Sequence, residues 1–256
     1  MILTVNVSNS NVLIGGYKNG KRYFCSAMYT NVQKSADEYA VRLNALLSLY
    51  HISAEDIEGV IFSCVVPSLL GCIRKAVSHL YSGRIYIVGP GLKTGLQIRM
   101  DDPAQLGSEL VCMAAAVHNQ YTLPCVIISM DTATSFVVLD QKGTLRGGAI
   151  LPGTKISMDA LCARTAQLPQ IDISAPANGV LGTNSISCMQ SGAVFGTASM
   201  IDGMIDRFAD ALGSAPFCIA SGELCPVILP HCVHSIQYHE HLVLDGLYQL
   251  YLKNTK

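Results

Sequence analysis

The pattern of hydrophobic and polar positions divides the chain into two similar series of elements. In the first series, β-rich segments separated by polar turns predict three strands, followed by alternating helices and strands. Ser35 and Glu38 have the spacing of a capping box, which predicts the start of a helix. The expected strands are 2–7, 12–17, 22–27, 60–65 and 85–88, and the expected helices are 35–50, 67–81 and 103–121.

The same order of elements then begins again. The expected strands are 125–130, 136–140, 144–150 and 217–220, and the expected helices are 155–163, 186–208 and 242–252. Fourteen positions separate Asn6 from the hairpin residue Gly20, and fourteen separate Ser129 from Gly143. This repeat of about 120 residues predicts an α/β protein with two similar domains, 1–118 and 119–256, that face a cleft. One continuous sandwich with two similar hairpins is the alternative.

Composition narrows the classes of function. The 256 residues are 50% hydrophobic and 14% charged with a net charge of −1, which argues against binding to nucleic acid or to a membrane surface. No apolar run approaches the roughly 18 residues of a membrane helix, and the start lacks the basic region of a signal peptide. The ten cysteines contain no C-x-x-C pair, so we expect free thiols in a cytoplasmic protein whose partner is a small molecule or a protein.

A polar turn follows the first strand of each series. Small amide and hydroxyl residues in tight turns expose backbone N–H groups that can surround an anion. One such turn is typical of ordinary loop conformation, but two at equivalent places in a repeat favour a shared phosphate-bearing ligand. The candidate phosphate-binding residues are Asn6, Ser8, Asn9, Ser10, Asn11, Thr132, Ala133 and Thr134. The glycine-rich P-loop pattern is absent from the sequence.

Four longer segments resemble the motifs of one family, the type III pantothenate kinases. Gly89–Gly95 (GPGLKTG) is similar to that family's GPGVKTG, and Gly147–Gly153 (GGAILPG) to its GGAIAPG. Asp159–Pro169 resembles DALFERTAKLP, and Gly182–Ser185 with Met189–Gly192 resembles GKNT followed by MQSG. The four matches keep the family's order along the chain.

This resemblance implies an actin-like fold of the acetate and sugar kinase superfamily, with an RNase H-like unit in each domain. It implies ATP-dependent phosphorylation of pantothenate, the first step toward coenzyme A, assisted by Mg²⁺ and a monovalent cation (K⁺ or NH₄⁺). It also implies a dimer in which Ser185 reaches the pantothenate site of the neighbouring subunit. The other substrate-binding residues implied are Gly89, Lys93, Thr94, Gly95 and Gly107.

The two turns depart from the family's pattern in charged residues. The first family turn reads D-x-G-N-T-N, whereas Asn6 here carries no charge for Mg²⁺ and Ser8 replaces a glycine. The second reads D-x-G-T-A-T-T, and Ser129 replaces its cation-binding aspartate. Asp131 replaces the glycine beside the phosphates; it would repel phosphate by about 4 kcal/mol at 4 Å and an effective dielectric of 20 unless a cation bridges them. Asp131 is therefore a weak candidate metal ligand.

The family's catalytic base lies in a G-A-D-R segment that matches 107–110 of this chain. Glu109 keeps a carboxylate that is one methylene longer, and Leu110 replaces the arginine. Glu109 is therefore the candidate catalytic base. Glu223 adds a further negative charge in the segment that resembles the family's T-G-G-L.

Three hypotheses follow from this mixture of retained and lost residues. The first is a divergent pantothenate kinase that is active as a homodimer. The second is one subunit of a heterodimer with a more complete paralogue, because Ser185 is retained while the aspartates at 6 and 129 are lost. The third is a non-catalytic pantothenate-binding or regulatory homologue. The cysteines and histidines between residues 225 and 241 have zinc-like spacing, but structural or surface histidines are the favoured interpretation.

Overall fold

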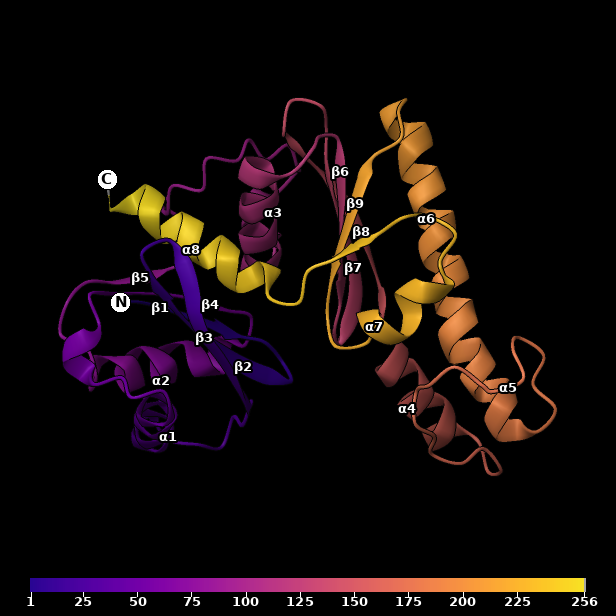
Figure 1. Ribbon diagram of the computed structural model, residues 1–256, viewed down its shortest axis with the longest axis horizontal. Helices are drawn as coiled ribbons and strands as arrows, with labels where there is room; N and C mark the ends of the chain where they lie inside the picture. Colours follow the sequence, from indigo (N-terminus) through magenta and orange to yellow (C-terminus); the bar gives the residue numbers. More distant parts are fainter. Residues whose placement is uncertain (256) are drawn as a thin grey trace. The chain divides into compact units, whose positions relative to one another are not determined.

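The computed structural model describes residues 1–255, which form two compact units (Figure 1). The first unit contains Met1–Gly95, Asp102–Asn119 and the chain from His241 onward, and the second contains Leu96–Asp101 and Gln120–Glu240. The closing helix therefore belongs to the first unit, which differs from the predicted second domain of 119–256. Each unit is built around one five-stranded mixed sheet.

The sheet of the first unit has β1 as its central strand, in the order β3-β2-β1-β4-β5. Its strands are β1 (Ile2–Val7), β2 (Asn11–Lys18), β3 (Lys21–Tyr29), β4 (Gly59–Cys64) and β5 (Ile85–Ile87). β1 is antiparallel to β2 and parallel to β4. The hairpin between β2 and β3 turns at Asn19 and Gly20, both with positive φ, as the sequence predicts.

Helices cover both faces of this sheet. They are α1 (Ala36–Leu49), α2 (Pro67–Ser78), α3 (Ser108–Gln120) and α8 (Leu242–Asn254), with short 3₁₀ turns at Ala54–Asp56 and Pro103–Gln105. Leu3, Val5 and Val7 of β1 belong to the core formed with α1 and α2. The capping box of Ser35 and Glu38 at the start of α1 is confirmed.

The predicted helix 103–121 begins five residues later than expected. Asp102 accepts a hydrogen bond from the backbone N–H of Ala104 and caps only a 3₁₀ turn. Leu106 then has extended backbone angles, so α3 starts at Ser108. This break leaves Gly107 and Glu109 at the beginning of a helix.

Helix α8 packs against β1, β2 and β4 of the first unit. The ring of Tyr248 stacks on that of Tyr17 with centroids 4.4 Å apart. Asp245 accepts hydrogen bonds from the Tyr17 hydroxyl and, at 3.0 Å, from the Arg22 guanidinium. Burial, and then the Asp245 carboxylate, raise the pKa of Tyr17. These contacts join residues more than 220 positions apart. They explain why the closing helix packs in the first unit although it follows the second unit in the sequence.

The second unit repeats the arrangement of the first. Its sheet has the order β10-β9-β6-β7-β8, and its central strand β6 is antiparallel to β7 and parallel to β9. The strands are β6 (Cys125–Met130), β7 (Ala133–Leu139), β8 (Leu145–Pro152), β9 (Phe217–Ser221) and β10 (Gln237–Tyr238). The predicted internal repeat is thereby confirmed at the level of strand order.

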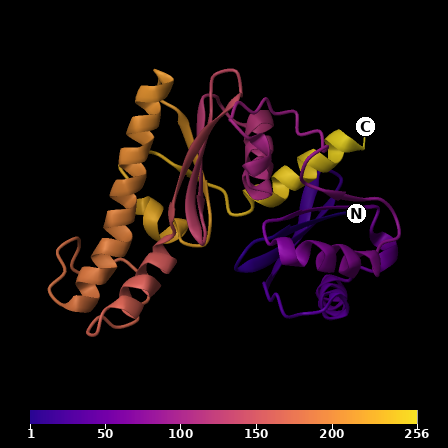
Figure 2. The ribbon, with the colours of Figure 1, turned by 180° about the vertical axis from the view of Figure 1, so that it is seen from behind.

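The helices of the second unit include one long continuous helix (Figures 1 and 2). It consists of α5 (Ser185–Ser191), a π-helical turn (Gly192–Gly196) and α6 (Thr197–Leu212), and it corresponds to the predicted helix 186–208. The others are α4 (Thr154–Arg164), α7 (Cys225–Ile228) and a 3₁₀ turn at Leu229–His231. The sequence did not predict α7 or the two-residue strand β10. Across residues 1–255, no helix is both long and apolar enough to cross a membrane.

Two helical glycines give a matched test of the packing of α8. A Cβ on Gly246 would lie 1.9 Å from the backbone oxygen of Cys112 in α3, whereas a Cβ on Gly71 in α2 would meet nothing within 4 Å. We expect Gly246→Ala to lower the free energy of unfolding by about 1–3 kcal/mol, measured by urea denaturation. Gly71→Ala should raise it by up to about 1 kcal/mol because alanine favours the helix. Equal effects would contradict this packing.

Candidate functional site

Asn6 lies near the end of the central strand β1 and is fully buried. Its side-chain oxygen accepts a hydrogen bond of 2.5 Å from the hydroxyl of Ser63, its register partner on β4. Its side-chain nitrogen donates a hydrogen bond of 3.2 Å to a carboxylate oxygen of Glu109. The structure therefore brings together two of the predicted site residues, Asn6 and Glu109, and adds Ser63 as a second hydrogen-bond partner of Asn6.

Glu109 lies in the first turn of α3, where the helix dipole stabilises a negative charge. One helical turn further, the thiol of Cys112 is fully buried. Burial raises the pKa of Cys112 well above its ordinary value, and the charge of Glu109 raises it further. Cys112 therefore remains a protonated thiol, and the ionisable group directed toward Asn6 is the carboxylate.

The first turn is closed by the side chain and backbone of Ser8. Its N–H and its hydroxyl both donate to the backbone oxygen of Asn11 at 2.9 Å, and the hydroxyl accepts from the N–H of Asn11. Thr30, after β3, donates to the backbone oxygens of Ser8 and Ser10. Asn9 and Ser10 are exposed at the tip. The Ser8 hydroxyl thus shapes the turn, and the exposed tip is the part that a ligand can approach.

The second turn is packed against a glycine. The N–H of Asp131 donates to the oxygen of Ala133 at 3.1 Å, and the N–H of Gly153 donates to the oxygen of Thr132 at 3.0 Å. A Cβ on Gly153 would lie 2.2 Å from the oxygen of Asp131, so only glycine allows this approach. Asp131 and Thr132 are exposed, and Thr134 is buried.

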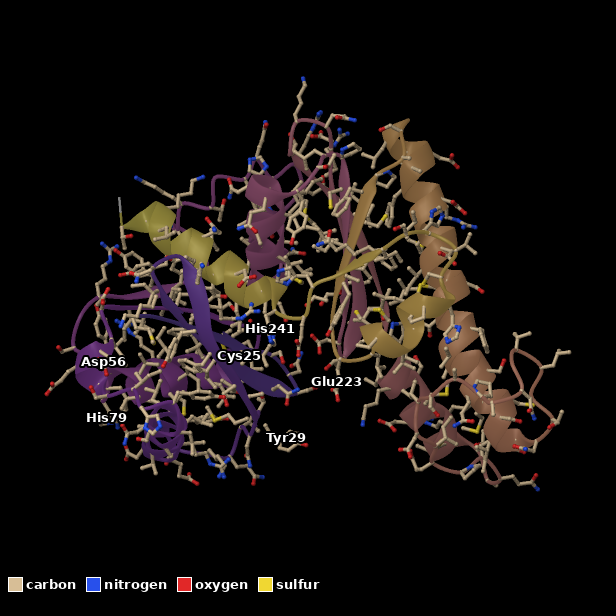
Figure 3. All side chains as sticks on the ribbon, viewed as in Figure 1. Cys25, Tyr29, Asp56, His79, Glu223 and His241 are labelled. Carbon is tan, nitrogen blue, oxygen red and sulfur yellow. The ribbon has the colours of Figure 1, made fainter. Side chains whose placement is uncertain are left out.

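A second carboxylate lies near Asp131. The pKa of Asp131 is raised, first because the surrounding protein limits its hydration and then because of the negative charge of Glu223. Glu223 follows Gly222 beyond the end of β9 (Figure 3). Gly222 has a φ of 137°, and a Cβ there would lie 2.2 Å from the oxygen of Met130. Glu223 is thereby held next to the second turn.

Ser129 is the middle residue of a row of serines. It pairs with Ser135 on β7 and with Ser221 on β9, and all three are buried. The row supplies hydroxyl groups and no charge. Ser129 therefore does not replace the negative charge of the cation-binding aspartate that the resemblance implies.

The predicted substrate segment 89–95 is hydrogen-bonded to α8. Asn254 accepts a hydrogen bond of 3.0 Å from the N–H of Lys93 and donates one of 2.9 Å to the oxygen of Lys93. Gly91 and Gly95 both have positive φ. The Lys93 side chain remains exposed. Asn254 is a residue that the sequence analysis missed, and its polarity near the end of an apolar helix was the available signal.

The predicted site residues belong to both units. Asn6–Asn11, Gly89–Gly95, Gly107 and Glu109 lie in the first unit, whereas Ser129–Thr134 and Ser185 lie in the second. Ser185 is exposed in the first turn of α5, after the capping residue Asn184. Ser63 was missed, although its place at the end of the strand beside β1 indicates a partner for Asn6.

The cysteines and histidines between residues 225 and 241 do not form a metal site. His234 contacts Asp206 at 2.8 Å and the ring of His231 packs against Phe195. His241 points toward Cys25 of β3, with Nδ1 and Sγ 3.7 Å apart (Figure 3). Within the described part of the chain, no group of three or more His, Cys, Asp or Glu residues could hold a metal ion.

The family model and the relatives found by sequence agree on one family. The family model described as type III pantothenate kinase matches residues 2–207. A protein named type III pantothenate kinase from Citrifermentans bemidjiense is 34% identical over 254 residues, covering 99% of this chain and all of that protein.

Solved structures share the fold at low sequence identity. Component A of (R)-2-hydroxyglutaryl-CoA dehydratase from Acidaminococcus fermentans matches with a TM-score of 0.58 and 13% identity, over 100% of this chain and 99% of that chain. An inorganic polyphosphate/ATP-glucomannokinase from an Arthrobacter species matches with a TM-score of 0.51 and 10% identity, over 98% of each chain. These matches show the actin-like ATPase and sugar kinase fold, as the resemblance implied.

The contact between Asn6 and Glu109 predicts a pH-dependent effect of Asn6→Asp. Two carboxylates at this distance repel, which raises the folded-state pKa of one of them. The destabilisation should be absent below the unfolded pKa of about 4 and complete above the raised pKa. We expect a loss of about 1–3 kcal/mol at pH 8 and almost none at pH 4, measured by urea denaturation. Asn9→Asp, at the exposed tip of the same turn, should show no such pH dependence.

Proposed function

Because this chain belongs to the type III pantothenate kinase family, we propose that it phosphorylates the hydroxyl group of pantothenate with ATP, at the start of coenzyme A synthesis. The observation that carries the proposal is the carboxylate of Glu109, which Asn6 holds at the beginning of α3. All ten cysteines are free thiols, which suits the reducing cytoplasm in which we place the reaction.

Glu109 has the chemistry of a general base. The hydroxyl oxygen of pantothenate would form a bond to the γ-phosphorus of ATP, while the bond from that phosphorus to the bridging oxygen of ADP breaks. The hydroxyl proton passes to Glu109. The Asn6 amide donates to one carboxylate oxygen, so that the side chain keeps a fixed direction. Since a displacement of about 1 Å can cost a factor of about 10² in rate, this fixation is the function that we assign to Asn6.

The exposed tips of the two turns are proposed to bind the phosphates of ATP. Asn9 and Ser10 would contribute in the first unit, and Thr132 with the backbone of Ala133 in the second. Thr134 and the Ser8 hydroxyl would keep the turns in shape. Backbone N–H groups in such turns attract anions without requiring a charged side chain.

Magnesium would enter with ATP as part of the nucleotide substrate. Asn6 is unsuited to bind magnesium directly, because it is uncharged and its side-chain oxygen already accepts a hydrogen bond from the hydroxyl of Ser63. Asp131, with Glu223 nearby, supplies the negative charge that a cation prefers. Ser129 offers only a neutral hydroxyl for K⁺ or NH₄⁺, so this residue alone does not fit the monovalent-cation site.

Pantothenate is proposed to bind beside the segment 89–95 and Gly107 of the first unit. The positive charge of the exposed Lys93 suits its carboxylate, and the backbone anchor from Asn254 keeps this segment in place. Thr94 offers a hydroxyl to the same ligand. Ser185 would come from the neighbouring subunit of a dimer.

The second unit carries apolar side chains that suit such a dimer. Large hydrophobic residues on β8, on α4 and around the start of α5 are exposed: Ile150, Ile156, Leu161, Val180, Leu181 and Ile186. Helix α4 buries only Thr154. The segment before α5 is fastened to it by a hydrogen bond from Ser191 to the oxygen of Val180. Apolar surface of this extent is typical of an interface between subunits, and we propose a second copy or a paralogous subunit as its partner.

Replacement of Glu109 by glutamine tests the catalytic role. Glutamine keeps an oxygen that can accept from Asn6 but cannot take a proton, so we expect kcat to fall by about 10²–10⁴-fold with little change in the KM for ATP. The measurement is a coupled assay of ADP release with pantothenate, ATP, Mg²⁺ and K⁺. Glu55→Gln, which removes an exposed carboxylate from the same unit, should leave kcat unchanged.

Three outcomes of this assay, combined with a measurement of pantothenate binding, decide between the alternatives. Turnover that requires co-purification with a paralogous subunit, and that is lost when Ser185→Ala is introduced into this chain, would indicate a heterodimeric kinase. Pantothenate binding without turnover in any mixture would contradict the kinase proposal and indicate a regulatory protein. Equal kcat for Glu109→Gln and the unsubstituted protein would reject Glu109 as the base.

The proposed dimer is tested by one charged substitution. Leu181 is 79% exposed, so Leu181→Asp should not disturb the folded subunit but should weaken association by at least about tenfold through burial of an unpaired charge. Analytical ultracentrifugation measures the dissociation constant. Val233→Asp, at a side chain that is 90% exposed on the loop before β10, is the matched control and should leave association unchanged. Equal effects of the two variants would exclude the surface around Leu181.

A further inference from the structure

A cavity of about 620 Å³ lies in the second unit, and all its lining residues belong to that unit. The turn at Asp131 precedes β7, whereas the cavity is lined by Val138 and Asp140 at the other end of that strand. It is therefore separate from the proposed phosphate-binding turn. Its volume is within the range of roughly 300–1,000 Å³ of small-molecule sites.

One wall of the cavity is apolar. Phe208, Ala211 and Leu212 line it from the last turns of α6, where their spacing of three and four places them on one helix face. The ring of Phe208 also packs against Phe136 of β7, with centroids 5.7 Å apart. The buried side chain of Val138 lines the cavity from the sheet.

The rim of the cavity is basic. The chain at 97–99 runs beside β8, with hydrogen bonds of 2.8 Å from the N–H of Arg99 to the oxygen of Leu145 and from the N–H of Leu145 to the oxygen of Gln97. Gln97 and Arg99 alternate with Ile98, and Arg146 follows Leu145, so that their side chains line the cavity together. Lys142, in the hairpin between β7 and β8, adds a third cation.

The cations at the rim outnumber the carboxylates. Arg146 contacts Asp140 at 3.3 Å, and the Asp140 carboxylate also accepts the backbone N–H groups of Lys142 and Thr144 at 2.9 Å. Asp140 therefore neutralises part of the positive charge of Arg146. The positive charges of Arg99 and Lys142 remain for a ligand. Gly147 also lines the cavity, and a Cβ there would meet nothing within 4 Å, so the space beside it is open.

We propose that this cavity binds a small organic anion, most suitably a phosphate monoester with a flat apolar group. The apolar group would lie against Phe208 and Leu212. The phosphate would bind the guanidinium groups of Arg99 and Arg146, which suit phosphate geometry. This site is additional to the sites proposed for ATP and pantothenate, and it does not depend on the kinase activity.

A tryptophan at position 208 provides the measurement. The chain contains no tryptophan, so Phe208→Trp gives a single fluorescent reporter in the cavity wall. Phenyl phosphate is the probe, with inorganic phosphate, phenol and benzoate as comparisons. We expect saturable binding of phenyl phosphate. Inorganic phosphate and phenol should each bind more weakly by about tenfold or more, because the first makes only the contacts of the phosphate and the second only those of the apolar group. Benzoate should bind more weakly than phenyl phosphate, and equal binding of the two would contradict the assignment of a phosphate monoester.

Charge-removing variants show where the probe binds. Arg99→Gln and Arg146→Gln, singly and together, should weaken phenyl phosphate binding by about tenfold or more in the double variant. Arg207→Gln, on α6 beside Phe208 in sequence but outside the cavity lining, should have no effect. Isothermal titration calorimetry repeats the comparison without the reporter. Binding that is unchanged in the double variant, or no saturable binding in either experiment, would overturn the proposal.

Discussion

A fully buried amide must make its hydrogen bonds inside the protein, and Asn6 does so with two residues that are far apart in the sequence. Ser63 donates to its oxygen and Glu109 accepts from its nitrogen. A missing partner would leave a polar group unsatisfied, at a cost of roughly 1–3 kcal/mol. The parallel pairing of β1 with β4 fixes Ser63, and the late start of α3 fixes Glu109. This requirement connects the central strand of the first unit to the proposed chemistry.

The contact between Asn6 and Glu109 relates two departures from the family pattern that appear independent in the sequence. The family pattern has aspartate at the position of Asn6 and a shorter carboxylate at that of Glu109. With asparagine at position 6, the side chain becomes a hydrogen-bond donor, and the longer Glu109 reaches it at 3.2 Å. An aspartate at position 6 would instead oppose the charge of Glu109. The absence of a negative charge at position 6 and the longer side chain of the proposed base, Glu109, are thus compatible with each other.

The sequence predicted the strands well because their apolar runs and turn residues are local signals. The hairpin at Gly20 and the capping box of Ser35 rest on neighbouring residues, and the repeat was visible as a recurring order of elements along the chain. The boundary of α3 was wrong because Pro103 is a helix-starting signal that a 3₁₀ turn also satisfies. The placement of α8 was wrong because its partners, such as Tyr17, are more than 200 residues away. The contact between Asn6 and Glu109 escaped prediction for the same reason.

The two turns connect equivalent strands but differ in length and in electrostatics, because three residues separate β1 from β2 and two separate β6 from β7. In the first unit, the end of the central strand carries a neutral amide that holds a carboxylate of α3. In the second, the end of β6 carries neutral serines, while Asp131 and Glu223 raise the local negative charge. An ATP phosphate near Asp131 needs a cation between them, whereas the first turn offers uncharged backbone at its tip. In the proposed reaction, the second turn would therefore supply negative charge for a nucleotide-bound cation, and the carboxylate of Glu109 in the first unit would take the proton of the substrate.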